Sequence, residues 1–395
     1  MISLTDARAR WAGAQWLDQR RDASLHDVCS ATGWIRTLGG AAGYLALWTR
    51  TPGVTVELVN AAVESGDLKV LPAARGCIYL VPRAHAALAL RLADSLSATR
   101  NTRDLEKAGA TEHELEVLGE HILEALAEGP ASTTSMRNRL PSDAARSLGE
   151  AGKKVGITST LPPALRRLEF AGRVERCPLD SRLDHERYAW RLPTDNVLQT
   201  APQLADVDEV HKDMAALYFS WAGPATRKEF ASWTGLNQTQ ARAAIAAAGL
   251  VEVEVELLGE CFAHPDSQRP SASERVALLP ALDNFFGLRA SALPLVEPEH
   301  AHIEVAMFGN RPSVPLGEAT LPLERTMAHA GRIVGTWGWD TEEGRVEAHA
   351  FDAAQPDAEE LRAATQLLRT LGHGKSFSLD NDQSLQTRLD RMRAR

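Results

Sequence analysis

The sequence predicts an α+β fold in which three short helical bundles, each followed by a β-hairpin, precede a β-rich region. Two observations carry this prediction. An amphipathic helix that ends at glycine and leads into alternating strand residues occurs three times, and this order is typical of a helical bundle with a hairpin behind it. After Arg275 the pattern changes to short strands separated by turn residues.

The first two repeats begin with clear helix signals. A helix is predicted over residues 55–66, where Gly66 ends it, and a hairpin over 69–81. A second helix is predicted over 161–172, because two prolines stand in its first turn and Gly172 follows it. Residues 173–192 then form the predicted second hairpin.

The third repeat has an alanine-rich helix over 238–249, and the residues from Leu250 alternate with the period of a half-buried strand. The second and third repeats also share a lead-in phrase, Gly-Pro-Ala-Ser at 129–132 and Gly-Pro-Ala-Thr at 223–226. Each phrase places a hydroxyl at a helix N-cap, and Glu229 completes a capping box. The chain is therefore expected to contain an internal repeat.

Helices are also expected within 84–97, 111–128 and 358–371, and the last residues, 388–395, read as a basic tail. Each bundle with its hairpin has the layout of a winged helix, in which a helix enters the DNA groove and the hairpin forms the wing. The predicted domains are winged helix 1 (1–83), a helical connector (84–128), winged helix 2 (129–195), winged helix 3 (205–270) and a barrel-like β domain with a terminal helix and the basic tail (271–395).

Composition excludes several classes of protein. The hydrophobic fraction is 44%, but no segment approaches the roughly 20 apolar residues that cross a bilayer, and no secretory signal is recognisable at the start. We therefore expect a cytoplasmic protein without a membrane partner. The four cysteines lie far apart, which argues against a zinc knuckle and a disulfide framework. Phosphate-loop, metalloprotease and nucleophile-elbow motifs are absent.

The charge of the chain is unevenly distributed. The net charge is −9, yet residues 131–191 carry twelve basic against seven acidic residues. Because lysine and arginine supply most of the non-specific affinity for DNA, this segment is a candidate DNA-binding surface. A solvated charged face is the alternative explanation.

Several phrases in the same order resemble the crosslink-repair DNA glycosylases of the AlkZ and YcaQ type, and together they span nearly the whole chain. The phrases are Leu45-Ala-Leu-Trp-Thr-Arg50, Arg75-Gly76, Leu165-Arg-Arg-Leu-Glu-Phe-Ala-Gly172, Phe230-Ala-Ser-Trp-Thr-Gly235, Leu278-Leu-Pro-Ala-Leu-Asp283 and Gly331-Arg-Ile-Val-Gly-Thr-Trp337.

The resemblance implies three winged helices and a barrel-like domain around duplex DNA, and hydrolysis of the N-glycosidic bond of alkylated or crosslinked purines. Active members carry a Gln-x-Gln or Gln-x-Asp motif about ten residues before the phrase that matches Ala46-Leu-Trp, and Arg36 and Leu38 occupy those positions here. Cys77 and Tyr79 likewise replace a threonine and a histidine of the family. The sequence therefore leaves glycosylase activity open.

Four residues near these phrases are candidates for the site. Arg36 suits a phosphate or a guanine edge, or else an ion pair within the first bundle, and Thr37 is a supporting hydroxyl and a candidate catalytic group. Trp34 would stack on a base or pack in the core. Asp283 is the carboxylate best suited to activate water, although an aspartate before a turn is also an ordinary cap.

A set of arginines on the second predicted groove helix and its wing fits phosphate contacts from both elements. Interleaved acids suggest that only about half of this set contacts DNA. The set consists of Arg166, Arg167, Arg173, Arg176, Arg182 and Arg187.

The expected partner is duplex DNA, possibly damaged, bound by a monomer. His300, His302 and Glu304 would share one face of a strand, but no fourth ligand is evident, so we expect no metal and no cofactor. The alternatives are a non-catalytic DNA-binding regulator or lesion-shielding protein, and a scaffold that binds a small ligand or a protein in its cleft.

Overall fold

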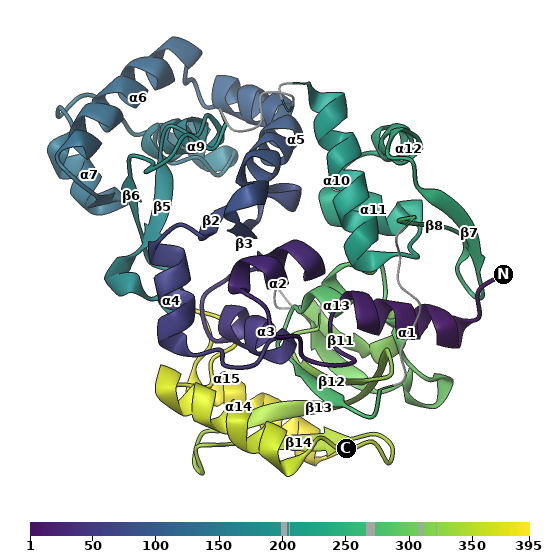
Figure 1. The fold of residues 1–395 in the computed structure, drawn as a ribbon. Helices are drawn as coiled ribbons and strands as arrows, with labels where there is room; N and C mark the ends of the chain where they lie inside the picture. The colour runs from purple at the N-terminus through teal and green to yellow at the C-terminus, as the bar shows by residue number, and fades with distance from the viewer. Residues whose placement is uncertain (199–203, 205, 266–272, 308–310, 321) are drawn as a thin grey trace.

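A computed structural model describes residues 1–198, 204, 206–265, 273–307, 311–320 and 322–395 of the chain. It confirms the α+β fold class, with helical units followed by a curled antiparallel sheet. In Figure 1, α5 to α9 form a lobe at the upper left, α10 to α12 lie at the right, and the yellow C-terminal helices lie at the bottom. None of the described helices is long and apolar enough to span a bilayer.

The first unit is a helical bundle with a three-stranded antiparallel sheet in the order β1-β3-β2. Its fourth helix begins where the hydroxyl of Thr55 accepts a hydrogen bond from the Leu58 amide, and Gly66 follows it with a φ of +81° that glycine adopts without strain. The elements are α1 (Leu4–Ala14), α2 (Leu25–Thr32), β1 (Ile35–Arg36), α3 (Ala42–Arg50), α4 (Val56–Glu64), β2 (Leu68–Pro72) and β3 (Ile78–Pro82).

The second unit follows a long connecting helix and has a core of its own. Leu118, Ile122, Leu165 and Trp190 are buried together in this core. The elements are α5 (Ala86–Lys107), α6 (Glu112–Ala127), β4 (Ala131–Ser132), α7 (Thr133–Arg139), α8 (Gly149–Lys154), α9 (Leu161–Phe170), β5 (Glu175–Pro178) and β6 (Tyr188–Arg191), with the strands in the order β4-β6-β5.

The third unit repeats the order of helices and hairpin. Thr226 and Glu229 form the predicted capping box at the start of α11. The elements are α10 (Val207–Ala222), α11 (Arg227–Thr234), α12 (Gln238–Ala247), β7 (Val251–Val255) and β8 (Gly259–Ala263).

The C-terminal region is built on a four-stranded antiparallel sheet in the order β14-β13-β12-β9. Two helices cover this sheet and a short hairpin extends it. The elements are β9 (Val276–Leu279), α13 (Asn284–Gly287), β10 (Glu304–Met307), β11 (Arg311–Pro315), β12 (Arg325–His329), β13 (Arg332–Asp340), β14 (Arg345–Ala350), α14 (Ala358–Leu371) and α15 (Asp382–Arg393).

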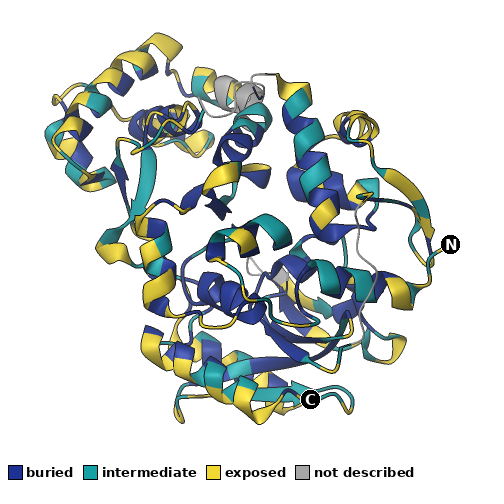
Figure 2. Ribbon diagram, viewed as in Figure 1, coloured by how far each residue is buried: buried dark blue, intermediate teal, exposed yellow. Residues whose placement is uncertain are grey.

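The first unit shares its core with two other parts of the molecule. Its α3 packs in one cluster with the C-terminal sheet and α14, where Trp48, Trp337 and Leu368 are buried. Its Trp34 and Tyr79 lie in a second cluster with α10 to α12. Figure 2 accordingly shows α3 as buried throughout, whereas α6 and α14 alternate between buried and exposed faces.

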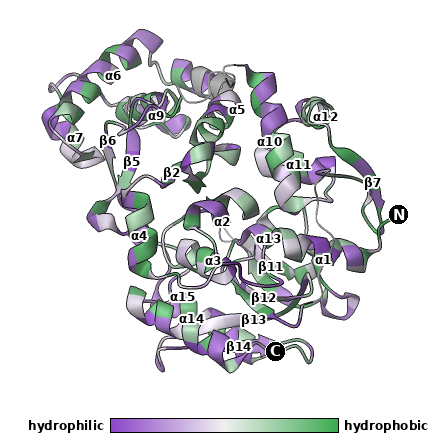
Figure 3. Ribbon diagram, in the orientation of Figure 1, coloured by the Kyte–Doolittle hydropathy of each residue, from purple (hydrophilic) through white to green (hydrophobic). Residues whose placement is uncertain are grey.

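The last residues differ from the predicted basic tail. Residues 382–393 form α15, which packs on β13, and Figure 3 shows hydrophilic and hydrophobic residues alternating along the neighbouring α14. Acids neutralise three of the arginines, and two of these acids come from distant parts of the chain that a local run of charges does not reveal. The pairs are Arg388 with Asp380 (2.7 Å), Arg393 with Asp340 (2.6 Å) and Arg395 with Glu324 (2.8 Å).

Candidate nucleic-acid interface

Three segments that are far apart in the sequence meet at residues 36–41. The amide of Gly40 donates to the carbonyl of Asp184 (2.7 Å), the amide of Ala41 to that of Lys375 (2.8 Å), and the amide of Ser378 to that of Leu38 (2.9 Å). We call residues 36–41, 183–188 and 373–380 the junction. It lies at the position where the family motif is expected.

Two glycines make this close approach possible. Gly39 and Gly40 have φ values of +69° and +62°, in the left-handed region that glycine populates without strain. A Cβ atom on Gly40 would lie 2.5 Å from the amide nitrogen of Phe377. A larger residue at this position would therefore push the segments apart.

Arg36 is the last residue of the short strand β1, and Thr37 follows it. Arg36 is half-buried and stands opposite Tyr79 in the ladder. Burial raises the pKa of Tyr79, and the charges of Arg36 and Arg75 oppose that rise. Thr37 is buried beside the hydroxyl of Tyr188, and burial raises the pKa of Tyr188 to about 12. Both tyrosines are therefore neutral at physiological pH, and neither is a general base.

Trp34 lies in an aromatic cluster and not on the surface. It is fully buried, and its ring centroid is 5.5 Å from that of Trp221 and 6.0 Å from that of Trp233. Its indole nitrogen donates to Nδ1 of His85 (3.2 Å). Burial lowers the pKa of His85 to about 4, so the histidine is neutral at pH 7. Stacking on DNA would require Trp34 to leave this cluster.

Asp283 is placed inside the molecule. Its two carboxylate oxygens accept hydrogen bonds from the Arg50 guanidinium at 2.9 and 2.7 Å, and one also accepts from the Phe285 amide at the start of α13. The side chains of Asp283 and Arg50 are 2% and 1% exposed. A carboxylate in this position has no access to bulk water and is not brought together with the junction.

Arg167 on α9 and Arg173, just after this helix, form ion pairs with glutamates on one side of α6. Arg167 lies 3.4 Å from Glu112 and 3.3 Å from Glu116, and Arg173 lies 2.9 Å from Glu120. All these pairs are solvent-exposed, so each contributes at most about 1 kcal/mol. A phosphate group would compete with them at small cost.

The wing arginines have mostly intramolecular partners. Arg176 pairs with the buried Glu169 at 2.6 Å. Arg182 pairs with Asp184 at 2.7 Å. Burial raises the pKa of Asp184, but hydrogen bonds from His373 and Arg182 outweigh it and hold that pKa well below its usual value. This carboxylate is a permanent anion inside the junction.

Only two arginines of the predicted set are exposed without a direct ion pair to a described residue. These are Arg166 on α9 and Arg187 in the junction. Sequence reasoning did not single out Lys375, which lies on the third segment of the junction. The sequence did offer one signal for Lys375. It lies in a short polar loop between two helical patterns, and loops often carry binding residues.

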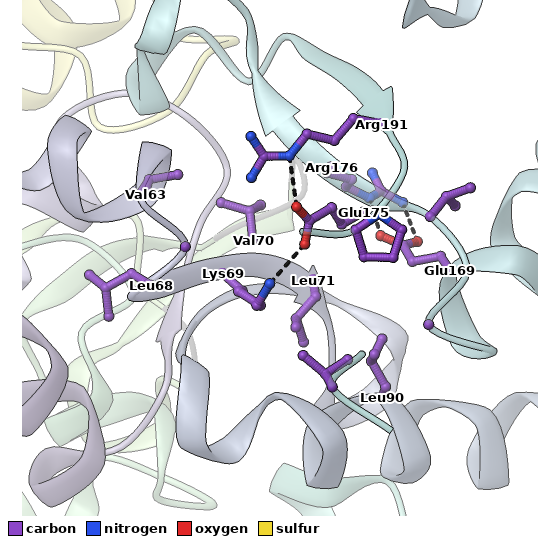
Figure 4. Close-up of a pocket in the computed structure, with 15 residues that line it drawn as sticks. Val63, Leu68, Lys69, Val70, Leu71, Leu90, Glu169, Glu175, Arg176 and Arg191 are labelled. Atoms are coloured by element: carbon purple, nitrogen blue, oxygen red, sulfur yellow. Dashed lines mark hydrogen bonds and ion pairs between the residues drawn. The ribbon is translucent and has the colours of Figure 1, made fainter. Parts of the chain in front are cut away.

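Two hollows elsewhere are unsuited to DNA. The first, of about 30 Å³, lies between the first and second units and holds no more than a water or two. Figure 4 shows its ion pairs, with Lys69 and Arg191 converging on Glu175. The second, of about 820 Å³, is lined by six apolar residues, three aspartates, two histidines and one arginine, so it offers phosphate a single arginine, and that arginine is already paired with Asp195. Within the described ranges, no group of three or more histidine, cysteine or acidic side chains is arranged to hold a metal ion.

One comparison with known proteins shows the family of the chain, and another shows its fold. A family model described as DNA glycosylase AlkZ-like matches residues 32–371. Among solved structures, the Streptomyces sahachiroi DNA glycosylase AlkZ is similar, with a TM-score of 0.68 and 19% sequence identity over 95% of this chain and 98% of that chain. No curated protein matches the sequence significantly. At this identity the structural match shows a shared fold.

Proposed function

Because the chain belongs to the AlkZ-like DNA glycosylase family, we propose that it binds duplex DNA in the manner of a glycosylase that excises alkylated or crosslinked purines, with a divergent active site. The protein acts as a monomer in the cytoplasm and uses three winged-helix units, and the junction is its contact with the damaged region. It needs no cofactor.

The observation that carries this proposal is the charge of the junction. The chain as a whole has a net charge of −9, whereas the three segments of the junction carry as many basic as acidic residues, Arg36, Arg187 and Lys375 against Asp184, Glu186 and Asp380. Asp184 and Asp380 are paired with arginines from outside these segments, Arg182 at 2.7 Å and Arg388 at 2.7 Å, so basic side chains outnumber acidic ones around the junction. Guanidinium and ammonium groups in such a setting suit phosphate oxygens.

The chemistry of base removal is the part that diverges. Cleavage of the N-glycosidic bond needs a group that positions water and stabilises positive charge on the sugar. A guanidinium at position 36 opposes such charge, and Asp283 is sealed against Arg50. These two observations favour a second candidate function, a protein that binds or shields lesions without cleaving them.

A base-release assay distinguishes the two. The protein is incubated in excess with duplex DNA that carries a single 7-alkylguanine, and free base is measured together with binding by fluorescence anisotropy. Binding with base release supports an active glycosylase. Binding without release supports the shielding function. Absence of binding to either modified or unmodified duplex contradicts the proposal.

A further inference from the structure

Leu379 is an apolar side chain left almost entirely in water. It is 93% exposed, whereas the next most exposed leucine among the described residues, Leu257, is 61% exposed. Burial of a leucine side chain is favourable, and the free protein does not gain this energy at Leu379. Single exposed leucines are common, so the surroundings of this one decide its meaning.

The loop that carries Leu379 is held firmly on both sides. A carboxylate oxygen of Asp380 accepts hydrogen bonds from the amides of Ser376 (2.9 Å) and Phe377 (3.3 Å), and Arg388 lies 2.7 Å from the same carboxylate. Phe377 is buried with Ala281 and Leu282 in a small cluster. The backbone is thus fixed while the side chain of Leu379 projects.

The loop is also part of the junction. Ser378, which precedes Leu379, donates its amide hydrogen to the carbonyl of Leu38 and its hydroxyl hydrogen to the carboxylate of Glu186. The exposed Arg187 follows Glu186 in the chain. The loop follows the last residue of the family match, Leu371. Leu379 therefore belongs to a segment outside the matched region that lies against the motif position.

We infer that Leu379 inserts into the base stack of duplex DNA bound at the junction. This inference rests on the proposed function. Unstacking a base step costs free energy. Burial of the leucine between the bases, together with contacts between neighbouring cations and phosphates, offsets this cost. A wedge of this kind needs a rigid support and an apolar tip, and the loop supplies both.

The test uses duplex DNA that carries 2-aminopurine, whose fluorescence rises when it is unstacked. Binding of the wild-type protein is expected to raise the signal. L379A is expected to lose that rise while anisotropy still reports binding, and L379M is expected to retain it. L293A, a control at an exposed leucine of the C-terminal region outside the junction, is expected to behave as wild type. Since Leu379 is exposed, the thermal midpoint of L379A should be unchanged.

Four results would overturn the inference. A wild-type complex that forms without a fluorescence rise, or an L379A complex with the full rise, shows that this leucine does not unstack the DNA. Loss of the rise in L293A as well as in L379A would show that the loss is not specific to the junction. Absence of any binding by the wild-type protein removes the proposed function as well, and anisotropy identifies that case separately.

Discussion

At the scale of single residues, burial separates structural groups from groups that can meet a ligand. Asp283 and Arg50 are a buried pair with two short hydrogen bonds, and loss of one partner leaves an uncompensated charge in the core. Arg187 has no such partner within the described part of the chain. Asp283 and Arg187 are both charged positions in the sequence, so only their surroundings in the fold distinguish them.

D283N is expected to lower the free energy of unfolding by about 3–5 kcal/mol, because the amide cannot compensate the charge of Arg50. Chemical denaturation measures this loss. D22N, at an exposed aspartate, is the control and should be close to neutral. A stable D283N protein that binds DNA but has lost base release would instead assign a catalytic role to Asp283.

His85 is expected to make stability fall in mild acid. Its pKa is about 4 in the folded protein, against 6.5 in its ordinary state, so the unfolded chain takes up the proton first as the pH falls. The stabilisation is complete above pH 6.5 and is lost progressively toward pH 4, by on the order of 3 kcal/mol. H85Q should lose less stability between pH 7 and 4.5 than wild type. Equal losses in both proteins would show that His85 does not carry this dependence.

At the scale of elements, the sequence predicted most helices and hairpins well. The predicted ranges 55–66, 161–172 and 238–249 contain α4, α9 and α12, because glycine stops and N-terminal caps are local signals. The ion-pair partners of charged side chains were not predictable in this way. Arg167 and Arg173 lie more than fifty residues from the acids on α6 that hold them, and a single sequence contains no signal for such contacts.

The acidic side of α6 is expected to weaken DNA binding by α9. E112Q/E116Q frees Arg167 from both of its partners, so affinity for duplex DNA should rise roughly two- to fivefold, as the small strength of exposed ion pairs allows. Anisotropy at fixed salt measures the change. E342Q/E343Q removes the same charge at an exposed turn after β13. An equal rise in this control would attribute the effect to net charge alone.

At the scale of the whole molecule, the cores divide the chain differently from the predicted domains. The first unit shares clusters with the C-terminal sheet and with the third unit, while the second unit has a separate core. The boundaries at 83, 128 and 195 stay predictions. Hydrophobic periodicity shows which side of a helix is buried, but it does not show which distant element covers it.

We expect the second unit to open before the rest of the molecule, because cooperative units follow separate cores. Hydrogen exchange should show α6, α9 and β6 losing protection together, at a lower denaturant concentration than α3 and β13. Simultaneous loss of protection in all five elements would indicate one cooperative unit, joined through ion pairs such as Lys69 with Glu175.

The most direct test of the account is the salt dependence of duplex DNA binding. Each phosphate contact contributes about 0.9 to the slope of log affinity against log salt. R166A/R187A is therefore expected to bind more weakly than wild type and to have a slope shallower by roughly 2, whereas R362A, at an exposed arginine on α14, should match wild type. Unchanged affinity and slope in R166A/R187A would contradict the placement of DNA on α9 and the junction.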